Sequence, residues 1–134
     1  VLNFLFPEIP GNHPSRKSIA TNLLANVLGL GWAATPAGLK AMEELADLEE
    51  ERRKKKQRAV PIGAASNEMC DFLILNISSL QLIPVNIIAF RTEYGSVTPT
   101  AIVGPAILAT AVSTGIAIFY IKIRKYIYRK LFDR

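Results

Sequence analysis

Cysteine and histidine are almost absent from this sequence of 134 residues, which contains one of each, Cys70 and His13. A single cysteine excludes an internal disulfide framework and a cysteine-based zinc site. A single histidine leaves too few ligands for a histidine-based metal centre and little basis for a Ser-His-Asp arrangement. No nucleophile–base pair and no phosphate-binding loop is visible in the sequence. We therefore expect no metal, no cofactor and no enzymatic activity.

Charged side chains are missing from long parts of the chain, although half of its residues are apolar. Residues 18–39, 72–90 and 94–121 contain no Asp, Glu, Lys or Arg, whereas residues 36–68 contain fourteen. A soluble domain would distribute its charges more evenly, and a disordered chain would have fewer apolar residues. The second and third uncharged stretches approach or exceed the length that crosses a bilayer as a helix. The sequence therefore indicates an integral membrane protein.

The net charge of +5 points to membrane topology in preference to a nucleic-acid partner, because the basic residues lie beside apolar runs and form no recognition motif. Residues 36–68 contain seven Lys and Arg, residues 122–134 contain six, and residues 91–97 contain one. By the positive-inside rule, the two basic regions lie in the cytoplasm. We expect a multi-pass protein of the cell membrane, with the lipid bilayer as partner and a cytoplasmic C-terminus.

The pattern of apolar runs predicts an all-α fold in a single membrane domain over residues 1–134. The predicted elements are a broken or re-entrant membrane helix over 18–35, a charged amphipathic cytosolic helix over 36–58, transmembrane helices over 69–90 and 99–121, and a basic cytosolic tail over 122–134. In the charged helix the acids precede the bases, which complements the helix dipole. Glycine and proline are expected to interrupt the membrane helices at Gly29, Gly31, Pro84, Gly104 and Pro105.

Amide and hydroxyl side chains recur inside the uncharged stretches. They are Asn22, Asn26, Asn76, Ser79, Gln81 and Asn86. Facing lipid they would be costly, so they are expected to face protein, water or a ligand. Two interpretations remain open for them. They form a polar path for a small solute or ion beside a broken helix, or an interhelical hydrogen-bond network that holds a bundle together.

Small residues recur at four-residue intervals in the last apolar stretch, at Ala109, Ser113 and Ala117. Such a ridge lets the backbone of another helix approach closely. We expect this ridge to be a helix-packing surface.

Several Gly-, Pro- and Asn-containing stretches resemble one known family. They are residues 26–31 (NVLGLG), 33–42 (AATPAGLKAM), 65–70 (ASNEMC), 76–84 (NISSLQLIP), 94–96 (YGS), 104–105 (GP) and 109–110 (AT). In these stretches the chain resembles the spore maturation protein A family over nearly its whole length. That family is similar to nucleoside-recognition, or gate domain, membrane proteins. The resemblance implies a gate-like domain in the forespore membrane that lacks the family's N-terminal helices.

The resemblance also implies a role in dehydration of the spore core and in spore heat resistance, together with a partner, spore maturation protein B. Two functions remain open. The chain is a membrane gate or transporter component for a small solute or ion, or it is a non-transporting scaffold or assembly subunit for its partner.

Overall fold

The computed structural model describes residues 2–78 and 81–132, and within them all regular structure is helical. The elements are α1 (Leu2–Leu5), α2 (Ser15–Val27), α3 (Gly31–Lys54), α4 (Asn67–Ile77), α5 (Val85–Glu93), the 3-10 helix η1 (Pro99–Ile102) and α6 (Val103–Phe132). The prediction of an all-α fold is confirmed.

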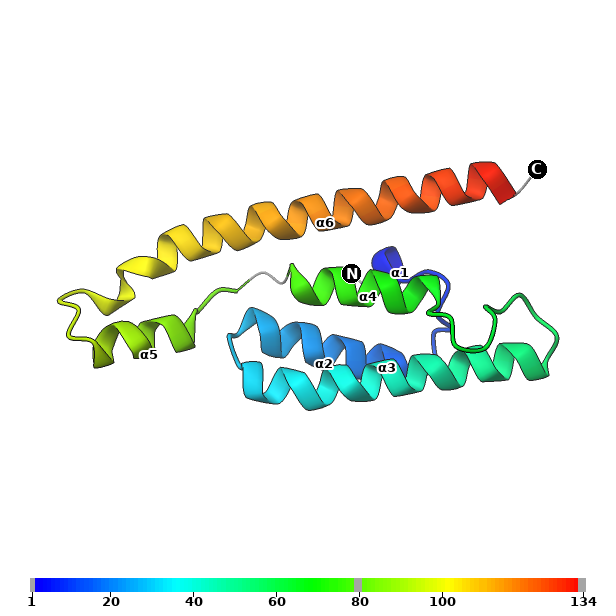
Figure 1. Ribbon diagram of the computed structural model, residues 1–134, viewed down its shortest axis with the longest axis horizontal. Coiled ribbons are helices and arrows are strands. Elements are labelled where there is room, and N and C mark those ends of the chain that lie inside the picture. Colours follow the sequence, from blue (N-terminus) through cyan, green and yellow to red (C-terminus); the bar gives the residue numbers. More distant parts are fainter. Residues whose placement is uncertain (1, 79–80, 133–134) are drawn as a thin grey trace.

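The molecule is long, and its helices lie roughly along one axis (Figure 1). Helices α2 and α3 form an antiparallel hairpin, α4 packs on that hairpin, and α6 runs past α4 along the length of the molecule. The core between them contains Ile19, Leu45, Phe72 and Ile121, all at most 1% exposed. At the other end, α5 and η1 pack together beside the start of α6.

The charged helix begins earlier and ends earlier than predicted. Instead of covering 36–58, α3 begins at Gly31 and ends at Lys54, and Pro36 lies inside it. Proline is tolerated there because it is near the helix start, where it deprives only the Trp32 carbonyl of a helical partner. The helix stops where Lys56 adopts a left-handed φ of 53°. The predicted interruption within 18–35 is therefore a chain reversal at 28–30 that makes a hairpin, and Gly31 is the first residue of its second helix.

The helix predicted over 69–90, with an interruption expected at Pro84, is divided in two, because α4 ends at Ile77 and α5 begins at Val85. At the end of α4 the Ser78 hydroxyl donates to the Ile74 carbonyl, 2.8 Å away, and Pro84 precedes the first residue of α5. At about 1.5 Å per residue, neither short helix reaches the ~30 Å thickness of a hydrocarbon core. This part of the chain is a discontinuous helix.

The last helix is longer and more regular than predicted. Gly104 and Pro105 do not interrupt it, because they lie in the first turn of α6, where a proline nitrogen has no helical hydrogen bond to lose. The stretch predicted as a basic tail over 122–134 continues the same helix, since α6 extends to Phe132. Among the described helices, one is long and apolar enough to cross a membrane, Pro99–Tyr128, with a mean hydropathy of 2.0 and 6% of its apolar window buried.

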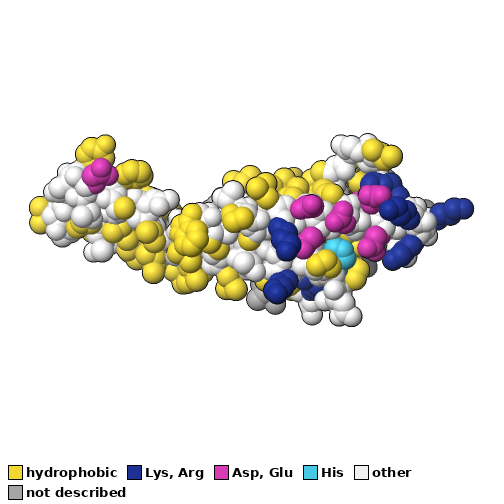
Figure 2. Space-filling view, turned by 90° about the horizontal axis from the view of Figure 1, so that it is seen from below, with side chains coloured by type: hydrophobic (Ala, Val, Ile, Leu, Met, Phe, Trp, Pro, Cys, Tyr) yellow, Lys and Arg dark blue, Asp and Glu magenta, His cyan; other side chains and the backbone are white. Residues whose placement is uncertain are grey.

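Charge is segregated along the molecule. Figure 2 shows acidic and basic side chains gathered over one half of a face, and mostly hydrophobic side chains over the other. Helix α6 also carries large exposed hydrophobic side chains, such as Leu108, Val112 and Phe119. A helix in the core of a soluble protein would bury such a surface.

Candidate functional site

Two interruptions of the helices meet in space, the tip of the α2–α3 hairpin and the linker between α4 and α5. The Leu82 N–H donates to the Val27 carbonyl at 2.8 Å. Gly29, with a φ of +74°, lies so close to the linker that a Cβ there would be 2.0 Å from the Ile83 carbonyl oxygen. Only glycine fits this position, both for its left-handed backbone and for the close approach.

A chain of amide side chains connects the hairpin to α4. Asn26 Nδ2 donates to Asn76 Oδ1 at 2.6 Å and to Asn22 Oδ1 at 3.2 Å. Asn22 is buried, and its own Nδ2 donates to the Ala34 carbonyl at 2.8 Å. Helix α3 comes so close that a Cβ on Gly38 would be 2.8 Å from Asn22 Nδ2. Amides that are buried or half-buried and hydrogen-bond one another in this way fix the relative positions of α2, α3 and α4.

Helix α6 supplies two hydroxyl groups to the same region. The Gln81 N–H donates to Thr110 Oγ1 at 3.2 Å, and the Thr110 hydroxyl donates to the Ala106 carbonyl at 2.8 Å. One turn later, the Thr114 hydroxyl donates to the Ser78 carbonyl. These contacts satisfy backbone groups that the interrupted helix leaves without helical partners. Sequence reasoning missed both threonines, although their four-residue spacing in an uncharged run is a signal that could have found them.

The structure brings together only part of the predicted polar set. Asn22, Asn26 and Asn76 are linked, and the backbone of Gln81 lies at Thr110. Asn86 was predicted to belong to the same polar set, but it is exposed on α5, because the helix predicted over 69–90 is interrupted between Asn76 and Asn86. Ser79 lies outside the described residues.

The predicted packing ridge on α6 is divided in two. Ala117 is buried within the chain, whereas Ala109 and Ser113 are exposed. The first two turns of the ridge therefore remain open to another helix.

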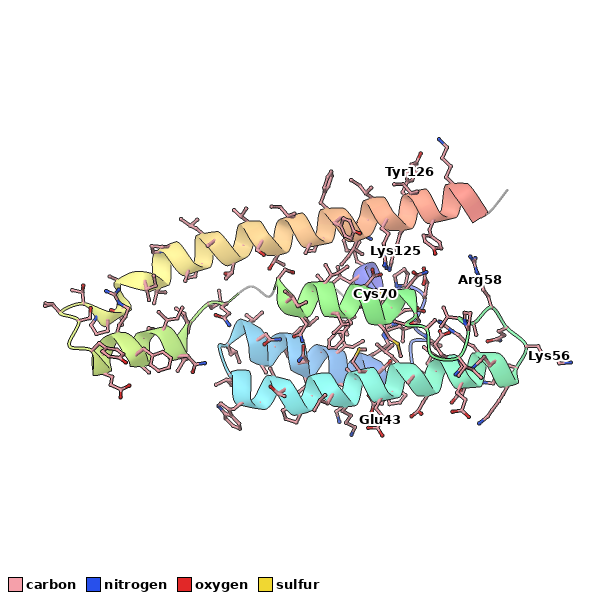
Figure 3. All side chains as sticks on the ribbon, viewed as in Figure 1. Glu43, Lys56, Arg58, Cys70, Lys125 and Tyr126 are labelled. Atoms are coloured by element: carbon pink, nitrogen blue, oxygen red, sulfur yellow. The ribbon has the colours of Figure 1, made fainter. Side chains whose placement is uncertain are left out.

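At the charged end, ion pairs join α3, α4 and α6. Asp71 is completely buried and pairs with Arg124 and with Lys125, whose Nζ lies 3.0 Å away on the side of α6 that faces α4 (Figure 3). Arg52 bridges Glu49 at 2.5 Å and Glu68 at 2.7 Å. Burial lowers the pKa of Arg52, but the hydrogen bonds and charges of Glu68 and Glu49 outweigh burial and raise it.

Metal binding has no visible basis in the described part of the chain. Across residues 2–78 and 81–132, no three or more His, Cys, Asp or Glu side chains are grouped so that they could hold an ion.

The fold and the site together define a class: a helical protein in which a hairpin and a discontinuous helix meet through amide and backbone hydrogen bonds beside one long apolar helix. No family model and no solved structure matches the chain. Spore maturation protein A of Bacillus subtilis (strain 168) is 47% identical over 126 residues, which is 94% of this chain. The chain belongs to the spore maturation protein A family, and it spans 58% of the length of this relative.

Proposed function

We propose that this chain is the gate-like membrane part of a spore maturation protein and that its meeting point of interrupted helices lines a gated path for a small solute or ion. The path would act in the forespore membrane during dehydration of the spore core. In this placement α6 crosses the bilayer, and the basic residues from Lys122 onward lie in the cytoplasm.

The depth of the site is the observation that carries the proposal. Thr110 is the middle residue of the uncharged helical stretch 99–121, with eleven residues on either side. At about 1.5 Å per residue it lies roughly 16 Å from each end, close to half of a ~30 Å hydrocarbon core. The linker that contacts Thr110, and the hairpin tip that contacts the linker, would therefore lie near the middle of the bilayer.

Irregular backbone at that depth is tolerated only where it is covered by protein or lines a water-filled cavity. Helix ends and free carbonyls near the bilayer midplane are the groups with which transporters hold solutes and ions. Asn26 and Asn76 add amide oxygens and N–H groups at the same place. These groups suit a small polar solute or a cation that exchanges its hydration shell for carbonyl oxygens.

The proposal is tested in a strain that lacks the endogenous protein. We expect Asn76→Leu and Gln81→Leu to lose spore heat resistance while their abundance in the membrane stays normal. Asn86→Leu is the matched control, because it is the same substitution at an exposed position outside the amide chain. Full heat resistance in both Asn76→Leu and Gln81→Leu would end the proposal of a path.

The exposed small residues Ala109 and Ser113 favour a second function, that of a non-transporting scaffold or assembly subunit. They leave room for a helix of a partner such as spore maturation protein B to pack closely on α6. Here Ser113→Leu should abolish co-purification with the partner, Ser113→Ala should retain it, and Asn76→Leu should have no effect. The opposite pattern would favour the path.

A further inference from the structure

A large cavity lies at the charged end of the molecule, well away from the hairpin tip. Its volume is about 1460 Å³, and its walls come from the end of α3, the segment 57–61, the start of α4 and the last turns of α6. Six of the side chains that line it are basic, namely Arg52, Arg58, Lys122, Arg124, Lys125 and Lys130.

The charges in and beneath the cavity form a balanced inner set and a cationic outer set. In the inner set three cations pair with three carboxylates, since Arg52 bridges Glu49 and Glu68 while Asp71 holds both Arg124 and Lys125. The inner set is therefore neutral.

Among the described residues that line the cavity, the outer set comprises Arg58, Lys122 and Lys130, together with the carboxylate of Glu8. Its formal charge is three minus one, or +2. Figure 3 shows Arg58 extending from its loop on the side of α6. Lys122 Nζ donates to the Phe4 carbonyl at 2.8 Å and lies over the Phe4 ring, 3.4 Å from its centre, so it is anchored at the cavity wall while its charge still contributes to the outer set. The cavity therefore favours an anion that accepts several hydrogen bonds.

The cavity also lies at a defined depth if α6 crosses the bilayer as proposed above. The uncharged stretch ends at Ile121, and the basic residues that line the cavity begin at Lys122. Tyr126 and Tyr128 also line it, and tyrosine is enriched at the level of lipid headgroups. The cavity would therefore open among the headgroups of the cytoplasmic leaflet.

We propose that this cavity binds the phosphate group of an anionic lipid headgroup. Basic pockets between membrane helices on the cytoplasmic side bind such headgroups, and Lys and Arg are the usual partners of phosphate oxygens. A neutral inner set fixes the walls without repelling the anion, and the cationic outer set supplies the attraction. The bound lipid would hold the ends of α3 and α6 and the loop between α3 and α4 together.

The test uses the whole chain, purified in detergent and titrated with phosphatidylglycerol or with the zwitterionic phosphatidylcholine, with bound lipid counted by native mass spectrometry. We expect the chain to bind phosphatidylglycerol in preference to phosphatidylcholine. The affinity for phosphatidylglycerol should fall about tenfold or more in the double variant Arg58→Gln/Lys130→Gln, because each cation near an anionic headgroup adds attraction. Lys54→Gln/Lys55→Gln is the matched control, since it removes the same charge from exposed positions outside the cavity.

Equal binding of the two lipids, or equal loss in the two double variants, would overturn the proposal. A further arm adds glycerol 1-phosphate. If this soluble phosphate binds as tightly as phosphatidylglycerol, and its binding is lost in Arg58→Gln/Lys130→Gln, the lipid assignment is overturned in favour of a free phosphate. Asn76→Leu should leave phosphatidylglycerol binding unchanged, so failure of the proposed path and failure of this site remain distinguishable.

Discussion

Replacing Gly29 by alanine should separate the hairpin tip from the linker that follows α4. The added Cβ would lie 2.0 Å from the Ile83 carbonyl oxygen, below the 3.0 Å that real Cβ contacts essentially never cross. The partner atom is backbone, so it cannot turn aside as a side chain would. The tip has to move, and the hydrogen bond from Leu82 to Val27 is lost with it.

The magnitude follows from a comparison with two other glycines. Gly63 and Gly95 also have positive φ values, +83° and +72°, but a Cβ at either would meet nothing within 4 Å. Alanine at those positions costs only the strain of the left-handed backbone, about 1–2 kcal/mol. Gly29→Ala also leaves the Leu82 N–H unpaired, which lowers the local stability by about 1–3 kcal/mol more.

Hydrogen exchange measured by mass spectrometry reports this local opening on peptides that cover residues 81–84. We expect exchange there to be about tenfold faster or more in Gly29→Ala, because about 1.4 kcal/mol corresponds to a factor of ten. Gly63→Ala and Gly95→Ala should leave these peptides unchanged. Equal exchange in all three variants would refute the close contact between the tip and the linker.

The remaining predictions concern the buried polar groups. Asp71→Asn should lower the free energy of unfolding, measured by chemical denaturation, by about 3 kcal/mol or more, because Arg124 and Lys125 lose the carboxylate that they share. The control is Glu51→Gln, which removes an exposed pair with Lys55 and should change the free energy of unfolding by less than about 0.5 kcal/mol. Asn22→Asp should lower the free energy of unfolding by about 1–3 kcal/mol at neutral pH, since an ionised carboxylate cannot donate a hydrogen bond to the Ala34 carbonyl. A thermal unfolding midpoint equal to that of the unaltered chain would contradict the hydrogen bonds described for the amide chain.

The local breaks in the helices could be predicted from glycine and proline, but their consequences in space could not. The chain breaks at Gly29, as expected, because its φ is positive. Thr35-Pro36 and Thr98-Pro99 look alike in the sequence, yet only the second begins a helical element. Helix α3 starts earlier, at Gly31, because Ala34 packs against α2 and its carbonyl accepts from Asn22. That contact is tertiary, and spacing along the chain does not show it.

The candidate site was predictable to a similar degree. Asn22, Asn26 and Asn76 stood out because amides are expensive in an apolar run, and the structure links them. The contacts from Thr110 and Thr114 to the interrupted helix bring together pairs of residues that are 29 and 36 positions apart, which no local pattern specifies. Asn86 was misplaced because residues 69–90 read as one apolar run, and the break in that run moves Asn86 onto another helix.

The central claim is that α6 faces lipid while the linker beside Thr110 faces protein and water. Single cysteines in a Cys70→Ser chain reconstituted in vesicles test it directly, with labelling by a membrane-impermeant thiol reagent. We predict rapid labelling of Tyr94→Cys in the exposed turn, slower but measurable labelling of Gln81→Cys, and none of Leu108→Cys on the exposed apolar face of α6. Labelling of Leu108→Cys as fast as Tyr94→Cys, or Gln81→Cys as inert as Leu108→Cys, would contradict the account.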